Sequence, residues 1–140
     1  MPSSGALEVK IMDTAVIKSV NTSATLTFCD RDADYFTVVY ESPSVILKKR
    51  VWGYTDCDFL VNLFSFIAKE WKGWQGAQEW ASIEGEFAIC ATSDNLGHVM
   101  LTIKIKEFDG PEVWDSIVQL GIDASQTENI AKSVRTFFAN

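Results

Sequence analysis

The sequence predicts an α+β domain, in which about eight strands form a mainly antiparallel sheet with two helices packed on one face. Apolar and polar residues alternate along much of the first 52 residues and again between residues 83 and 122. Two other segments, near residues 56–72 and 125–138, repeat apolar side chains at three- and four-residue intervals. The expected order is therefore a β-rich half, a helix, a β-hairpin plus one strand, and a C-terminal helix.

Five strands are expected before the first helix, because turn-forming residues separate five short alternating or β-rich segments. These are Leu7–Ile11, Ala15–Val20, Ala24–Cys29, Tyr35–Glu41 and Val45–Trp52. An aspartate-rich turn precedes the fourth segment, and a Ser-Pro-Ser break at residues 42–44 precedes the fifth.

The first helix is expected to begin near Asp56, a favourable N-cap, and to stop at Gly73. Its apolar stripe, expected in the core, comprises Phe59, Leu60, Leu63, Phe64, Ile67, Ala68 and Trp71.

Three strands and a second helix are expected in the remainder of the chain. Ile83–Ala91 and Val99–Ile105 flank an Asp-Asn-Leu-Gly turn and predict a hairpin, and Trp114–Ile122 predicts a further strand. The last helix is expected to open with a capping box in which Ser125 and Glu128 each satisfy a backbone N–H. Its buried stripe comprises Ile130, Ala131, Val134, Phe137 and Phe138.

Size, charge and composition limit the function classes. The 140 residues, 47% of them hydrophobic, predict a single domain spanning residues 1–140 with a full core. A net charge of −7 disfavours nucleic acid and anionic membranes as partners, and no apolar run is long enough to span a bilayer. Three cysteines, odd in number and far apart, favour reduced thiols and a cytoplasmic location.

His98 and the carboxylates after the third strand are the first groups to consider for chemistry. As the only histidine, His98 excludes a multi-histidine metal site; we expect it on the polar strand face, hydrogen-bonded near a turn. Asp30, Asp32 and Asp34 match part of a calcium-loop spacing, but Tyr35 stands where the loop needs glycine. A solvated turn is therefore expected, and neither a metal nor another cofactor is implied.

Glu84 and Glu86 are expected on one face of a strand, about 7 Å apart. Such a pair beside tryptophans could act in glycoside hydrolysis, but alternation on any half-exposed strand produces the same pair. Trp71 and Trp80 are expected in the core, whereas Trp74 either closes the core or stays exposed as an anchor. No catalytic residue is assigned.

The chain contains the pattern Trp71-x-Gly73-Trp74-x-Gly76-x-x-x-Trp80-x-Ser82-x-Glu84-Gly85-Glu86, followed by Gly97-His98-Val99-x-Leu101. With this pattern it resembles a family of small bacterial proteins of unknown function. The resemblance implies no activity and no catalytic residues. Members are similar in size and organisation to immunity proteins of bacterial toxin systems.

The leading hypothesis is thus a non-enzymatic cytoplasmic binding protein, an immunity protein that neutralises a toxin with a basic domain. Its predicted partner-binding residues are Trp74, Glu84, Glu86, His98, Asp30, Asp32 and Asp34. The alternative is a small-molecule or glycan binder, or a small enzyme, with a pocket formed by Trp74, Trp80, Glu84 and His98. A homodimer paired through a sheet edge or face is the third hypothesis.

Overall fold

A computed structural model describes residues 13–54 and 57–139 of the protein. Over these residues it confirms the predicted α+β class, with eight antiparallel strands and two helices. The strands are divided between two four-stranded sheets, and in each sheet neighbouring strands follow one another in the chain. The strand expected at Leu7–Ile11 and the N-cap expected at Asp56 lie outside the described residues.

The first sheet contains β1 (Ala15–Lys18), β2 (Thr25–Asp32), β3 (Tyr35–Glu41) and β4 (Ile46–Trp52). Alternation decides which side chains enter the core, because successive residues of a strand point to opposite faces. The buried residues include Ile17, Leu26 and Val38. Beyond Cys29 a bulge shifts the pairing of β2 with β3, and Asp30 adopts a left-handed φ of 51° there.

The second sheet contains β5 (Gln78–Ala81), β6 (Phe87–Ser93), β7 (Val99–Glu107) and β8 (Trp114–Ile122). The sequence did not reveal β5, and the strand predicted from Ile83 to Ala91 begins only at Phe87. Residues 82–86 instead form a turn, in which Gly85 has a φ of +77° and its N–H donates to the Ser82 carbonyl. Ile83, expected on the buried strand face, is exposed in this turn.

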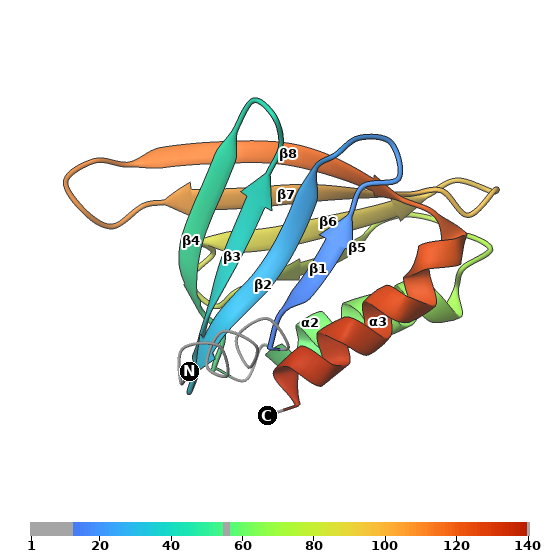
Figure 1. The fold of residues 1–140 in the computed structure, drawn as a ribbon, viewed down its shortest axis with the longest axis horizontal. Helices are drawn as coiled ribbons and strands as arrows, with labels where there is room; N and C mark the ends of the chain where they lie inside the picture. The colour runs from blue at the N-terminus through green and yellow to red at the C-terminus, as the bar shows by residue number, and fades with distance from the viewer. Residues whose placement is uncertain (1–12, 55–56, 140) are drawn as a thin grey trace, which may run out of the picture.

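Two helices, α2 (Cys57–Lys69) and α3 (Ala124–Phe138), lie side by side along one side of the molecule (Figure 1). They pack against each other, and α3 also contacts β1 while α2 contacts β5. The two sheets contact each other where β4 meets β7. The helix pair therefore fills the space between the β1 and β5 edges and completes the core.

One hydrophobic core joins both sheets and both helices through phenylalanine rings. Phe28 of β2 is fully buried, and its ring centroid lies 5.8 Å from Phe36 of β3 and 5.9 Å from Phe87 of β6. It also lies 6.4 Å from Phe64 of α2 and 5.9 Å from Phe138 of α3. Edge-on and tilted ring contacts of this kind add to the stabilisation from burial.

Two residues expected in the stripe of α2 are exposed. Phe59 is 63% exposed because it lies about 90° from the centre of the buried stripe, at about 100° per residue. Trp71 is 50% exposed because the helix ends at Lys69, before Trp71 and before the stop expected at Gly73.

The capping box predicted for α3 from Ser125 and Glu128 is wrong, because the helix begins one residue before Ser125. Asp123 is the N-cap and accepts a hydrogen bond from the Ser125 N–H, while the Gln126 side chain accepts from the Asp123 N–H at 2.8 Å. The capping-box chemistry is therefore present, with different residues.

Candidate functional site

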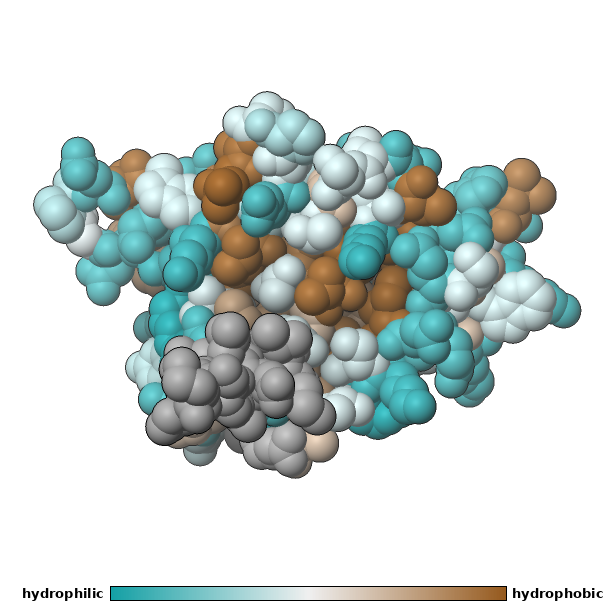
Figure 2. All heavy atoms as spheres, in the orientation of Figure 1, coloured by the Kyte–Doolittle hydropathy of each residue, from teal (hydrophilic) through white to brown (hydrophobic). Residues whose placement is uncertain are grey.

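Three turns from the two sheets border one pocket, on the lower left side of the molecule in Figure 1. They are the β2–β3 turn, the β5–β6 turn and the start of the β7–β8 turn, whose tip projects further to the left. The β2–β3 turn is fixed to the end of β4, because the N–H of Gly53 donates to the Asp34 carbonyl at 2.7 Å. We call this region the acidic end after the exposed carboxylates on these turns and the adjoining strand ends: Asp30, Asp32, Asp34, Glu84, Asp109, Glu112 and Asp115. Figure 2 shows hydrophilic residues at the left of the visible face, over the β7–β8 turn, and also along its right side.

A pocket of about 290 Å³ opens between the two sheets at the acidic end. It is lined by Tyr35, Lys49, Arg50, Trp52, Glu84, Glu86, Glu107, Phe108 and Asp109. Lys49 of β4 and Glu107 of β7 form a cross-sheet ion pair of 2.9 Å. The hydrogen bond from Lys49 lowers the pKa of Glu107 below its ordinary value. Together with the β4–β7 packing, this pair holds the two walls of the pocket in place.

Glu86 is a buried carboxylate in the wall of this pocket, with 3% of its surface exposed. It accepts hydrogen bonds from the Ser82 hydroxyl and from the backbone N–H of Trp52, the latter at 3.4 Å. Glu84, by contrast, is exposed. The prediction that both share a polar strand face is therefore wrong, because the turn at Gly85 precedes β6 and separates their environments.

Aromatic side chains lie at the pocket among the carboxylates, and the sequence pattern did not predict them as site residues. Tyr35, Tyr54 and Phe108 are each about half exposed. Trp52 packs on Tyr54 with ring centroids 5.6 Å apart, and the Arg50 guanidinium lies 5.8 Å from the Tyr35 ring. A Trp-Gly-Tyr sequence closing a strand beside an aspartate-rich turn is the signal that could have indicated them.

Trp74 and Trp80 do not line this pocket. Trp80 is buried, as expected, and packs 5.3 Å from Phe87. Trp74 is half-buried against the core, 5.4 Å from the Phe66 ring of α2. The structure therefore gives Trp74 a packing contact and does not bring it to the acidic end.

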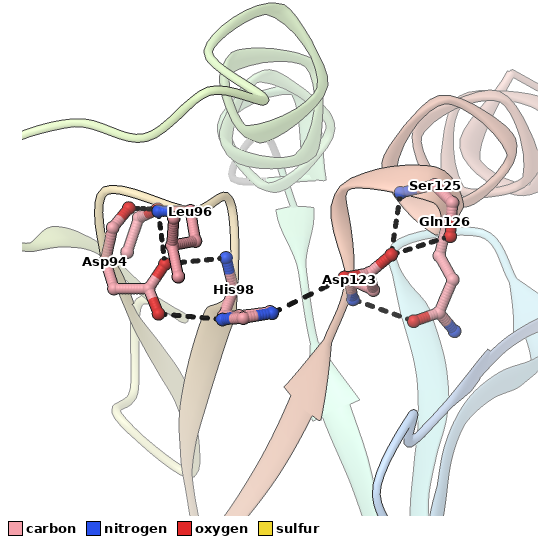
Figure 3. A network of polar contacts seen from close by, with 7 residues as sticks. Asp94, Leu96, His98, Asp123, Ser125 and Gln126 are labelled. Carbon is pink, nitrogen blue, oxygen red and sulfur yellow. Dashed lines mark hydrogen bonds and ion pairs between the residues drawn. The ribbon is translucent and has the colours of Figure 1, made fainter.

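His98 lies at the opposite end of β6 and forms a separate polar network (Figure 3). Its Nδ1 is 2.8 Å from Asp94 Oδ2, and its Nε2 is 3.9 Å from Asp123 Oδ1. Hydrogen bonds from the N–H groups of His98 and Leu96 lower the pKa of Asp94, and those from Ser125 lower the pKa of Asp123. The network connects the β6–β7 turn to the start of α3, which is the structural role expected for a histidine near a turn.

The pocket envisaged for a small-molecule ligand or a glycan is not formed. His98 lines a different cavity, of about 520 Å³, together with residues of the β1–β2 turn and β8. Glu84 lines the pocket at the acidic end, separated from His98 by the length of β6, which is about 20 Å for seven residues. The predicted partner-binding residues therefore divide into the acidic end, the His98 network and the packed Trp74.

Within residues 13–54 and 57–139, no group of three or more His, Cys, Asp or Glu side chains is arranged to hold a metal ion, the Asp30–Asp34 turn included. No helix within residues 13–54 and 57–139 has the length and apolar character needed to cross a membrane.

Comparison with known proteins gives one match. No curated protein and no solved structure matches the chain. Residues 17–140, which include both four-stranded sheets nearly in full and both helices, match the family described as "Family of unknown function (DUF6228)". The match covers most of the chain, and the chain therefore belongs to this family of unknown function, DUF6228.

Proposed function

We propose that the protein is a non-enzymatic binding protein whose acidic end docks a basic protein partner. We further propose that it is a bacterial immunity protein, acting in the cytoplasm, and that the partner is the toxin it neutralises. The observation that carries the proposal is the pocket bordered by turns of both sheets, in whose lining exposed aromatic rings lie together with exposed carboxylates.

The composition of the acidic end suits a protein interface. Half-exposed rings such as Tyr35 and Phe108 provide the apolar contact area that dominates binding energy at protein interfaces. Carboxylates around them, such as Asp32 and Asp109, form a polar rim that accelerates encounter with a basic surface and disfavours acidic competitors. The net charge of −7 adds a long-range attraction for a basic partner.

The test begins with affinity capture of the partner from the native host, followed by titration of the purified partner. Triple reversal at the acidic end, Asp32→Lys, Asp34→Lys and Asp109→Lys, should weaken binding at least about tenfold and flatten its salt dependence. The matched control reverses Glu41, Glu79 and Glu128, which are exposed carboxylates elsewhere, and should bind nearly as the wild type does.

Two further results decide the function. Co-expression with the wild-type chain should restore growth to cells that produce the captured partner, and the acidic-end triple variant should not. Equal loss of binding in both triple variants would show that net charge alone attracts the partner. A stable homodimer with no captured partner would replace this proposal with self-association.

A further inference from the structure

Among the residues that the structure describes, the buried carboxylate of Glu86 has no cation beside it. Removing a carboxylate from water is unfavourable unless it is paired or fully hydrogen-bonded. Over the described ranges, no Lys, Arg or His nitrogen lies within 4.0 Å of Glu86, and its donors are the Ser82 hydroxyl and the Trp52 N–H. Since a carboxylate offers about four lone-pair sites, Glu86 can accept further donors from the pocket.

The two cations that line the same pocket are engaged elsewhere. Lys49 is paired with Glu107 at 2.9 Å. Arg50 donates to the Thr37 hydroxyl at 3.0 Å and to the Asp30 carbonyl, on the outer side of the sheet. Neither cation neutralises the Glu86 carboxylate, so its negative charge is available to interact with a ligand in the pocket.

The lining of the pocket favours a planar cation. Two cations, Lys49 and Arg50, stand against four carboxylates, Glu84, Glu86, Glu107 and Asp109, which gives the lining a net charge of 2 − 4 = −2. Its aromatic walls are Tyr35, Trp52 and Phe108. A guanidinium stacks on aromatic faces and pairs with a carboxylate through two hydrogen bonds, whereas an ammonium is a strongly hydrated point charge. The volume of about 290 Å³ is at the low end for ligand pockets and suits one side chain.

We infer that this pocket binds the guanidinium of an arginine side chain, with Glu86 as its counter-ion and Trp52 as part of its aromatic wall. The assignment of that arginine to the partner rests on the proposed function. Binding of the guanidinium itself does not, so the two can be tested apart.

The pocket is tested with N-acetyl-arginine methylamide, titrated into ¹⁵N-labelled protein and followed by NMR. Saturable shifts are expected at the amide of Glu86 and at the amide and indole of Trp52. The neutral citrulline derivative should give none, and the lysine derivative should bind several-fold more weakly. Absence of saturable shifts with the arginine probe, or equal binding of the citrulline probe, would overturn the assignment.

Glu86→Gln is the decisive variant, because glutamine removes the charge and keeps one acceptor oxygen for the Ser82 hydroxyl, although its NH2 group replaces the oxygen that accepts from the Trp52 N–H. It should weaken the arginine probe about tenfold or more, whereas Glu84→Gln, in the same pocket but exposed, should change it less than about threefold. If Glu86→Gln does not fold, Trp52→Leu retains Glu86, removes the aromatic wall and should weaken the probe several-fold. Equal weakening by the Glu84 and Glu86 variants would contradict the role of Glu86.

The second part of the test measures the affinity of the Glu86→Gln variant for the protein partner. Loss of partner affinity in Glu86→Gln supports insertion of a partner arginine. Unchanged partner affinity, with the probe still dependent on Glu86, would refute that insertion while leaving the acidic end as the docking surface. If the probe binds and no basic partner exists, the proposed function fails and the guanidinium site stands.

Discussion

Replacement of Phe28 by alanine should be among the most damaging single changes to the core. The ring is fully buried and contacts rings of β3, β6, α2 and α3 at centroid distances of 5.8 to 6.4 Å. A buried Phe→Ala change costs about 3–5 kcal/mol, and the cost rises with the cavity that remains. Because four different elements would have to move inward to fill this cavity, we expect about 4–5 kcal/mol.

The matched control is Phe59→Ala, the same substitution at a ring that is 63% exposed, where the free energy of unfolding should change by no more than about 0.5 kcal/mol. Urea unfolding followed by fluorescence and circular dichroism measures the free energy of unfolding of both variants. In thermal unfolding, the Phe28 variant of a chain of this size should lose about 10–15 °C in Tm. A loss below about 2 kcal/mol for Phe28→Ala, or equal losses at both positions, would refute a core centred on this ring.

Two further predictions concern the opposite end of the second sheet. Gly97→Ala should lower the free energy of unfolding by about 1–3 kcal/mol more than Gly76→Ala in denaturant titrations. Both glycines have φ near +78°, but only at Gly97 would a Cβ meet the Trp71 carbonyl oxygen, at 2.6 Å. Equal losses in the two variants would exclude that clash. The pKa values of Asp94 and Asp123 are lowered from an ordinary 3.8, so their contribution to stability should be complete above that pH and lost as pH falls through the lower folded-state values. Denaturant titrations from pH 5 to 2 should show a shallower loss in Asp94→Asn than in the wild type, and identical slopes would contradict this account.

Local pattern was sufficient to predict most of the fold. Alternation identified the β2 and β7 segments because each is half-buried, with one face in the core and one outside. The β3 and β4 segments were placed by the turn residues that precede them. It missed β5 because four residues, Gln78–Ala81, are too few to establish a period. The division into two sheets could not be predicted either, because each sheet is a meander and the turn sequences do not indicate where one sheet ends.

The candidate site was less predictable, because it is made of turns that are distant in the sequence. Glu84 was identified singly, yet its place in one pocket with Lys49 and Arg50 depends on how β4 packs on β7. Tyr35 and Phe108 were overlooked because an aromatic residue at a strand end has the same local pattern whether it faces the core or solvent. His98 was grouped with Glu84 from strand-face parity, which carries no information about position along the strand.

Glu84 and Glu86 share one local sequence pattern but have different environments in the structure. Both residues satisfy the local rule that polar residues alternate with apolar ones, and only Gly85, through its left-handed φ, places Glu86 inside the wall between the sheets. The two carboxylate oxygens of Glu86 accept from two different donors, the Ser82 hydroxyl and the Trp52 N–H, whereas a glutamine would set an NH2 donor against one of them. These hydrogen bonds account for two acceptor oxygens at this position but do not neutralise the negative charge. Recognition of a cation in the pocket is a role that uses that charge.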